Sequence, residues 1–514
     1  MMENKRNYLL LLGGCFAVYL GFGLMHLFFG DLHDDEGFYV NTAKLVWEGK
    51  VPYRDFYFSQ PPVYPYFLGF FLKLFGANIW MGRAVSMSFG LFTMAFSTMA
   101  AHRLAGRYAG FFCALCFAAN PYLNYTFTIA KLFSGTSLWL ALFALIQTLS
   151  LAKTAKHTLA AVCLVLAVGT RLSVAPVLAL FLCCCGILEW RNWRLLGTVA
   201  GVTTVSLAVV YGPFMAMDFE VFSKEVYFFN LPEHHGASSF WATLPGKAFS
   251  TLKLVRDYMF VTAICVALLA AACGDGVKDL FARSKKSPLI AFLASGVGAL
   301  FAAHFVPATT FHNYHAVAFP WAAILAGCGI ASLVDGVKGK EVRRGVVLII
   351  VTVACAAGYP RSLAWFDITS LDDTDLRKIS RLADVLRTQA SGDGKVWSFE
   401  LSIPLAAGRD VPDRMAMGVF GFFSRYGGER GERFKVTDMD WHQRHLRNEK
   451  PQVIILRDSD FVMSHLVEVA SEEKLSRQSV FETAMGDDYE LVHETDSFGW
   501  HQDTVRVFIR KEVD

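Results

Sequence analysis

Three adjacent carboxylic acids, Asp34, Asp35 and Glu36, are the residues of this sequence that are best placed to do chemistry. They follow a long apolar run that ends near Phe29, which places them beside a membrane face. Carboxylates this close together repel one another near a low-dielectric boundary, which favours a general base. Helix capping is the alternative interpretation, because acids at a helix N-terminus accept hydrogen bonds from free N–H groups. One acid would have been enough for capping.

The residues around the acids predict two short helices that position them. Apolar side chains recur at helical spacing at Tyr39, Ala43, Val46 and Trp47. An amphipathic helix is therefore expected over 36–48, ended by Gly49. A second apolar stretch follows Pro61-Pro62 and ends at Phe75. It is too short to span a bilayer, and its aromatic residues suit a helix in the headgroup layer. Residues 31–78 thus form an external loop with two interfacial helices.

Composition assigns the rest of the chain to two regions. The 514 residues are 54% hydrophobic and only 18% charged, a deficit that soluble proteins do not show. Long apolar runs alternate with short basic connectors as far as Tyr359, after which charged residues become frequent. The sequence therefore predicts a polytopic α-helical membrane protein. Its membrane domain covers 1–359, and a soluble α/β domain covers 360–514.

About eleven membrane helices are expected from the apolar runs. Their approximate limits are about 8–29, 79–103, 108–123, 133–151, 157–170, 173–189, 194–214, 257–273, 288–306, 314–333 and 345–359. The connectors rich in Lys and Arg fall on the side of the N-terminus, which predicts that this side is cytoplasmic. Because the number of spans is odd, the C-terminal domain is expected on the extracytoplasmic side of the cytoplasmic (inner) membrane.

The first loop also resembles a known family. The resemblance is carried by Asp35-Glu36, Tyr39, Gly49, Pro52-Tyr53-Arg54-Asp55, Pro61-Pro62-x-Tyr64 and Phe75-Gly76. These residues look like the first-loop signature of the GT-C glycosyltransferases. The most similar group is glycosyltransferase family 39, which includes the protein O-mannosyltransferases and the lipid A aminoarabinose transferase. The match is clear over residues 35–105, and the many membrane helices with an outer soluble domain fit it more loosely.

The resemblance implies an inverting transfer of a sugar from a polyprenyl-phosphate carrier to a glycan, lipid or protein acceptor, on the extracytoplasmic face of the cell envelope. It implies that Asp35 is the catalytic base, and we name its neighbour Glu36 as the second catalytic candidate. Substrate-binding candidates in the same loop are Asp34, Tyr39, Arg54 and Asp55. Membrane lipids are expected partners, and no nucleic acid is expected.

Two departures from the aminoarabinose transferase concern the sugar and the metal ion. That enzyme has a basic residue three positions after the first-loop Asp, where this chain has Phe38. It also has an acidic–basic pair directly before the two prolines, where this chain has Ser59-Gln60. Both differences argue against aminoarabinose as the sugar and against that enzyme's metal site. We assign no metal ligands and name no certain cofactor, and dependence on a divalent metal ion is left open.

A phosphate leaving group needs cations, and charged residues in a membrane are costly enough to imply a role. Lys131 and Arg171 lie at the outer ends of predicted spans, and His312 and His315 open the tenth span from outside. Lys131 and Arg171 are therefore candidates for binding the substrate phosphate. The resemblance implies an Arg-Tyr pair where this chain has Asn313-Tyr314, so His312 and His315 are taken as the substrate-binding candidates there. Structural side chains that reach the interface are the alternative for Lys131 and Arg171.

The C-terminal region is predicted to be an accessory domain that covers the active site or guides the acceptor. Apolar spacing predicts a helix over 376–386, strands over 395–401, 453–456 and 489–493, a helix over 461–473 and a final strand around Val507. Asp-x-Asp triplets at 373–375, 438–440 and 458–460 lack a glycine-rich phosphate loop, so they do not indicate a nucleotide-sugar site. A transporter or lipid flippase is the competing function, but no internal repeat of hydropathy supports it.

Overall fold

A computed structural model describes most of the chain. The described residues are 5–227, 244–249, 252, 287–306, 311–337, 339, 341–342, 344–350, 352–353, 373–390, 394–423, 428–461, 463–464, 467–468, 471–499 and 501–511. They group into two compact units. The helical unit comprises Met1–Leu27, Ser86–Tyr211 and Phe240–Phe366, and the α/β unit comprises Phe28–Val85, Gly212–Ser239 and Asp367–Asp514. The predicted domain boundary at 359/360 lies outside the described residues and stays a prediction.

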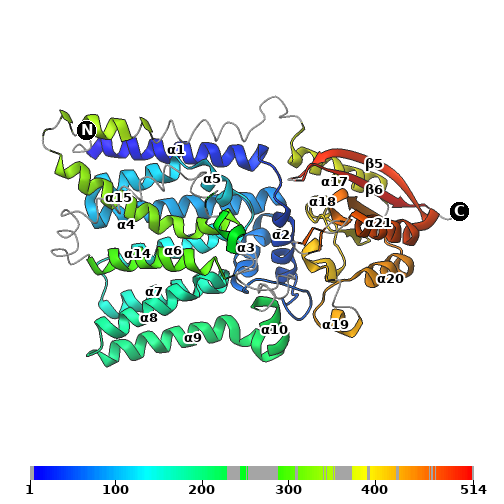
Figure 1. The fold of residues 1–514 in the computed structure, drawn as a ribbon, viewed down its shortest axis with the longest axis horizontal. Helices are drawn as coiled ribbons and strands as arrows, with labels where there is room; N and C mark the ends of the chain where they lie inside the picture. Colours follow the sequence, from blue (N-terminus) through cyan, green and yellow to red (C-terminus); the bar gives the residue numbers. More distant parts are fainter. Residues whose placement is uncertain are drawn as a thin grey trace. The chain divides into compact units, whose positions relative to one another are not determined.

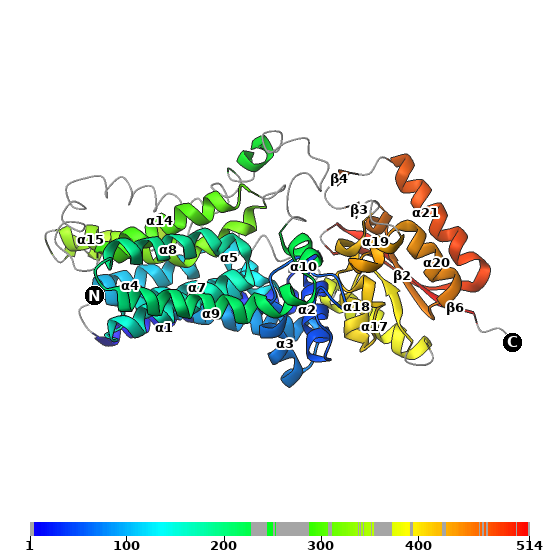
Figure 2. The same cartoon turned by 90° about the horizontal axis from the view of Figure 1, so that it is seen from below.

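The helical unit is built from long apolar helices that run side by side (Figures 1 and 2). Its helices are α1 (Lys5–Phe29), α4 (Ile79–Ala118), α5 (Pro121–Thr128), α6 (Leu132–Thr148), α7 (Lys153–Thr170), α8 (Ala175–Leu188), α9 (Trp193–Met217), α14 (Ser287–Ala303) and α15 (Phe319–Gly336), with the 3₁₀ turns η1 (Leu172–Val174) and η4 (His312–Ala318). The first residues of α4 and the last of α1 and α9 belong to the α/β unit.

Breaks between these helices follow from local sequence. Within α4 the backbone leaves the helical region at Ala105 and Gly106, where Gly106 has φ of 84°, so the two spans predicted over 79–103 and 108–123 meet at a kink. Asn120 caps α5 through its side chain, and Pro121 occupies the first turn. Between α7 and α8 the chain becomes extended at Arg171, which matches the predicted break there.

Four helical stretches among the described residues are long and apolar enough to cross a membrane. They are Lys5–Phe29, Ile79–Ala118, Trp193–Met217 and Asn313–Asp335, and a fifth is counted if the pair Tyr122–Thr128 and Leu132–Thr148, bent by 103°, is one span. Shorter apolar helices occur where further spans are predicted, at Leu172–Leu188 and Pro288–Ala303. The spans predicted over 257–273 and 345–359 lie wholly or partly outside the described residues, so the total of eleven stays a prediction.

The α/β unit contains both predicted interfacial helices. The first is α2 (Asp34–Trp47) and the second is α3 (Val63–Phe75). They pack closely because Gly69 has no side chain, since a Cβ there would lie 2.1 Å from Trp47 Cδ1. Phe70, Leu74 and Phe75 on α3 are exposed, as expected of a helix whose outer face meets lipid. The short helix α10 (Phe219–Val226) belongs to the same unit.

The C-terminal region folds around a four-stranded sheet. Its strands are β1 (Val396–Ser398), β2 (Val453–Arg457), β5 (Tyr489–Phe498) and β6 (Asp503–Arg510), in the order β1-β2-β6-β5. β1 and β2 are parallel, with Trp397 opposite Ile454, and the other neighbours are antiparallel. Its helices are α17 (Asp375–Gln389), α18 (Ser402–Ala407), α19 (Gly428–Arg433), α20 (Met439–Glu449) and α21 (Ser471–Met485). Figure 2 shows α17 on one side of the sheet and α20 and α21 on the other.

One predicted element of the C-terminal region is wrong. No helix covers 461–473, because the described residues there form the short antiparallel strands β3 (Met463–Ser464) and β4 (Val467–Glu468), and α21 begins only at Ser471. The apolar spacing indicated a helix, but the chain pairs here as two strands, because strand formation depends on the partner strand more than on local spacing. The remaining predicted elements are present with shifted ends, since the strand predicted over 395–401 is β1 and the helix over 376–386 is α17.

The first loop and the C-terminal region share one core. Phe38 on α2 contacts Phe420 at 5.0 Å between ring centroids, and the Asn41 side chain donates to the Ala416 carbonyl at 3.0 Å. Lys50 pairs with Asp413 at 2.6 Å. These contacts join segments that are more than 350 positions apart, so the helix that carries the acid cluster is packed against the C-terminal region.

Candidate active site

The acid cluster forms the first turn of α2. His33 is the N-cap residue, and its Nδ1 accepts a hydrogen bond from the Asp35 backbone N–H at 3.3 Å. The Glu36 side chain accepts from the His33 backbone N–H at 3.0 Å, which completes a capping box. Capping is thus performed by His33 and Glu36, and neither Asp34 nor Asp35 is needed for it.

Glu36 forms a buried ion pair that the sequence did not reveal. Its two carboxylate oxygens accept from Arg83 Nε at 2.7 Å and from Arg83 Nη2 at 2.6 Å, and both side chains are fully buried. Arg83 also donates to the carbonyls of Gly30 and Asp31 at 2.9 and 2.7 Å. This arginine, in the first turns of α4, therefore ties the end of α1 to the start of α2. A lone arginine in an apolar span was the available signal for it.

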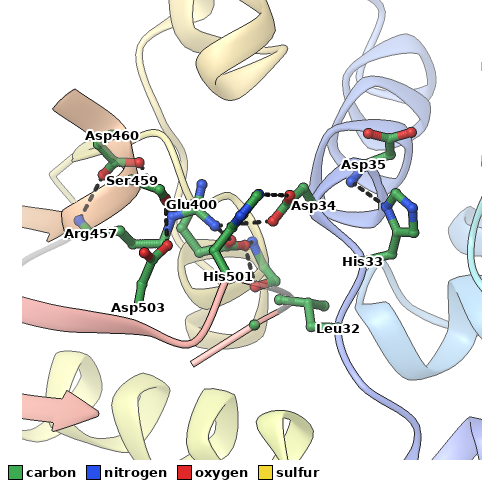
Figure 3. A network of polar contacts seen from close by, with 12 residues as sticks. Leu32, His33, Asp34, Asp35, Glu400, Arg457, Ser459, Asp460, His501 and Asp503 are labelled. Carbon is green, nitrogen blue, oxygen red and sulfur yellow. Dashed lines mark hydrogen bonds and ion pairs between the residues drawn. The ribbon is translucent and has the colours of Figure 1, made fainter. Parts of the chain in front are cut away.

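Asp34 is directed to the C-terminal region instead. One oxygen lies 3.3 Å from Arg457 Nη1 and the other lies 3.1 Å from His501 Nε2 (Figure 3). Burial raises the pKa of Asp34, but the hydrogen bond from His501 and the charge of Arg457 outweigh it, and the pKa is held below its usual range. The same hydrogen bond raises the pKa of His501 above that of a free imidazole.

Asp35 differs from both neighbours. In Figure 3 its carboxylate points away from the network around Asp34 and lies on the other side of the helix start. Successive residues of a helix project about 100° apart, so three adjacent acids must face three directions. Glu36 faces Arg83, and Asp34 faces Arg457 and His501. Asp35 is partly buried, as Asp34 is.

The remaining loop candidates lie in the same unit. Tyr39 is buried against Tyr64, with their ring centroids 5.4 Å apart. Arg54 and Asp55 pair with each other at 2.7 Å, and Asp55 also accepts from the Val51 backbone N–H. The hydrogen bond from Arg54 lowers the pKa of Asp55. The structure thus assigns packing contacts to Tyr39 and a local ion pair to Arg54 and Asp55, while their binding roles stay predictions.

The helical unit brings its cationic candidates together around one aromatic ring. Lys131 Nζ lies 5.3 Å and Arg171 Cζ lies 4.9 Å from the ring centroid of Phe133. Arg171 also lies over Tyr314, at 4.4 Å from its ring centroid. Both cations are buried, with 2% and 9% of their surfaces exposed. Two cations thus lie near one aromatic ring, and their binding of a phosphate group stays a prediction.

Polar residues extend this cationic cluster. Arg171 Nε donates to Ser173 Oγ at 3.1 Å, and the same hydroxyl lies 3.1 Å from His304 Nε2. The rings of His304 and His315 meet edge to face at 5.2 Å. His312 lies in η4, but its side chain is outside the described residues. Sequence reasoning missed Ser173, His304 and Tyr314, although His304 stands alone as a polar residue near the end of an apolar run.

The Asp-x-Asp triplets have structural roles. Asp438 caps α20 by accepting from the Trp441 backbone N–H at 2.7 Å. Asp460 pairs with Arg457 at 3.3 Å, and Asp373 pairs with Arg381. Within the ranges given above for the structure, no three His, Cys, Asp or Glu side chains are grouped as a metal ion would need.

No protein-family model and no curated protein sequence matches the chain. Solved structures do match its fold. The crystal structure of ArnT from Cupriavidus metallidurans in the apo state is similar with a TM-score of 0.63 at 16% identity, over 98% of each chain. Its complex with undecaprenyl phosphate gives a TM-score of 0.62 at 14% identity, over 97% of each chain. The oligosaccharyltransferase of Archaeoglobus fulgidus gives 0.53 at 12% identity, over 100% of this chain and 75% of that one.

These similarities extend over the whole chain, including both the helices and the C-terminal domain. At such low identity they establish the fold and leave the chemistry to the residues. The chain therefore has the fold of the ArnT structures, which the oligosaccharyltransferase shares over a part of its length.

Proposed function

We propose that the protein is an inverting glycosyltransferase that moves a sugar from a polyprenyl-phosphate donor to an acceptor hydroxyl. The observation that carries this proposal is the way the first turn of α2 is held. The ion pair of Glu36 with Arg83 and the contacts of Asp34 with Arg457 and His501 fix the residues on both sides of Asp35, and the Asp35 carboxylate points away from the network around Asp34. A carboxylate held in a fixed position is what a general base needs.

In the proposed reaction Asp35 accepts the proton of the acceptor hydroxyl. The acceptor oxygen forms a bond to the anomeric carbon while the bond from that carbon to the phosphate oxygen breaks. The electron pair leaves with the lipid phosphate, and the configuration at the anomeric carbon inverts. Glu36 and Arg83 hold the base in position and do not exchange protons with the substrate.

The cationic cluster of Lys131 and Arg171 would bind the departing phosphate. Both residues are buried and lie near the ring of Phe133, and charge-assisted hydrogen bonds to phosphate are stronger than neutral ones. The similarity to an ArnT structure that contains undecaprenyl phosphate supports a lipid-linked donor. We further propose that transfer takes place on the extracytoplasmic face of the inner membrane, with the N-terminus in the cytoplasm.

Arg171→Ala is expected to raise the KM for the lipid donor by roughly 10- to 100-fold, because hydrogen bonds to charged groups contribute about 1.5–3 kcal/mol. Arg171→Lys should recover only part of the loss, since a lysine cannot both contact Ser173 and stack on Tyr314. The matched control is Arg191→Ala, which removes an arginine that also lies over an aromatic ring, that of Trp190. Equal effects of both alanine variants would refute phosphate binding by Arg171.

The function itself is tested with purified protein in liposomes. The protein receives undecaprenyl-phosphate sugars carrying a radiolabel, one sugar at a time, with an envelope extract of a deletion strain as the acceptor source. Transfer of the label to extract material, with release of undecaprenyl phosphate, is the expected result. Turnover with a nucleotide sugar in the absence of lipid carrier would overturn the proposal. Movement of the intact lipid across the bilayer without covalent transfer would favour the flippase alternative.

A further inference from the structure

The carboxylate of Asp34 is held on both oxygens by side chains of the C-terminal region. Arg457 lies at the end of β2 and reaches Oδ1 at 3.3 Å, and His501 lies in the turn between β5 and β6 and reaches Oδ2 at 3.1 Å (Figure 3). We call Asp34, Arg457 and His501 the clasp. It connects the first turn of α2 with two strand ends of the sheet.

A second contact fixes the same two segments. Asp375, at the start of α17, accepts from the Leu32 backbone N–H at 2.9 Å through one oxygen. Its other oxygen accepts from the Gly499 backbone N–H at 3.0 Å. One buried carboxylate therefore connects the residue before the α2 cap with the turn that carries His501. The turn cannot move without affecting the start of α2.

The charged groups around the clasp determine what His501 contributes to it. Arg457 is buried and contacts three carboxylates at once, those of Glu400 at 3.0 Å and of Asp460 and Asp34 at 3.3 Å. The titratable and charged groups that face the clasp from every neighbouring element are His33, Glu400, Asp460 and Asp503, the last of which accepts from Ser459. One guanidinium contacts three carboxyl groups, and burial raises the pKa of Glu400 and raises that of Asp460 to about 6. When His501 is protonated, it supplies a second positive charge beside Asp34.

We propose that the clasp positions the catalytic base, which makes His501 and Arg457 positioning residues contributed by the C-terminal domain. This inference rests on the proposed function, because it needs Asp35 to be the base. Asp34 and Asp35 are consecutive residues in one helical turn, so a movement of Asp34 moves Asp35 as well. A misplacement of about 1 Å is enough to lower a rate by about 100-fold.

The clasp also gives transfer a dependence on pH. Hydrogen bonding to Asp34 raises the pKa of His501, so its charged form contributes fully below the ordinary imidazole pKa, and the contribution is lost as the pH rises through the raised value. The turnover number should therefore fall on the alkaline side, while the KM for donor should change little. The effect is moderated by solvent, since 42% of the His501 side chain is exposed.

His501→Ala and His501→Gln test this inference, with the radiolabelled undecaprenyl-phosphate sugar that gives turnover as the probe. His501→Ala should lower kcat by about 10-fold or more with little change in KM, in line with the sensitivity of rates to small misplacements. His501→Gln keeps a hydrogen-bond donor but carries no charge and does not titrate, so its kcat should equal the reduced value that the unmodified protein reaches at alkaline pH, exceed that of His501→Ala, and show no alkaline fall. Lys450→Ala is the control, because it removes an exposed ion pair with Asp488 in the same domain.

Hydrogen exchange of the peptide covering residues 31–40 provides a measurement that does not depend on activity. Faster exchange in His501→Ala than in the unmodified protein and in Lys450→Ala is expected. Unchanged exchange together with unchanged kcat would overturn the positioning role. Full activity of Asp35→Asn would instead refute the proposed base, while the exchange result would still decide whether the clasp holds the start of α2.

Discussion

Asp35→Asn is expected to reduce the rate of sugar transfer by about 10²- to 10⁴-fold, the usual contribution of a positioned general base. The amide has nearly the same size as the carboxylate, but it cannot accept the proton of the acceptor hydroxyl. Capping of α2 is unaffected, because it depends on His33 and Glu36. The loss should therefore appear in kcat, and expression and thermal stability should stay near their original values.

The matched control for this variant is Asp440→Asn. Asp440 is the second residue of α20, after the cap residue Asp438 and Met439, just as Asp35 is the second residue of α2 after His33 and Asp34. Both substitutions remove a favourable charge near a helix N-terminus, which is worth about 0.3–1 kcal/mol. Only Asp35→Asn should affect transfer. Near-normal transfer by Asp35→Asn would rule out this base and make Asp34 the next candidate.

Arg83→Met is expected to destabilise the protein by about 3–5 kcal/mol, because removal of one partner leaves a buried charge without compensation. The Glu36 carboxylate would stay fully buried without its Arg83 partner. The carbonyls of Gly30 and Asp31 would also lose the hydrogen bonds that Arg83 donates. Thermal unfolding in detergent measures the effect. Transfer should fall as well, since the first turn of α2 loses its attachment to α4.

The double variant Arg83→Met with Glu36→Gln should be more stable than Arg83→Met alone, because the unpaired charge is gone. Arg344→Met is the control, because Arg344 forms an exposed pair with Glu341, and such pairs contribute about 0–1 kcal/mol. A loss in Arg83→Met no greater than in this control would show that the buried pair does not support the fold.

Local patterns in the sequence predicted the first loop well. The spacing of Tyr39, Ala43 and Val46 predicted α2 to within two residues of its start, since periodicity reports which face of a helix is buried. Periodicity says nothing about the partner on that face. It could not show that Glu36, one of the two catalytic candidates, pairs with Arg83, 47 positions away in the sequence.

Long-range partners account for most of what sequence reasoning missed. Lys131 and Arg171 were identified one by one from the cost of a charge in a membrane, but the ring of Phe133 between them could not be foreseen. The contact of Asp34 with Arg457 joins residues 423 positions apart. The same limit explains the failure over 461–473, where the pairing of β3 with β4 decided the local structure.

The clasp has a consequence for how the protein is made. Arg457 is synthesised 423 positions after Asp34, which at 5–20 residues per second means a delay of roughly 20 to 85 s. Glu36 and Arg83 are close enough in sequence to pair early in synthesis, whereas the other side of the first turn of α2 must wait for almost the entire chain. We therefore expect nascent chains that stop short of β2 to insert into the membrane without a correctly placed Asp35. If Asp35 is the proposed base, sugar transfer should therefore begin only after β2 and the turn that carries His501 have been made.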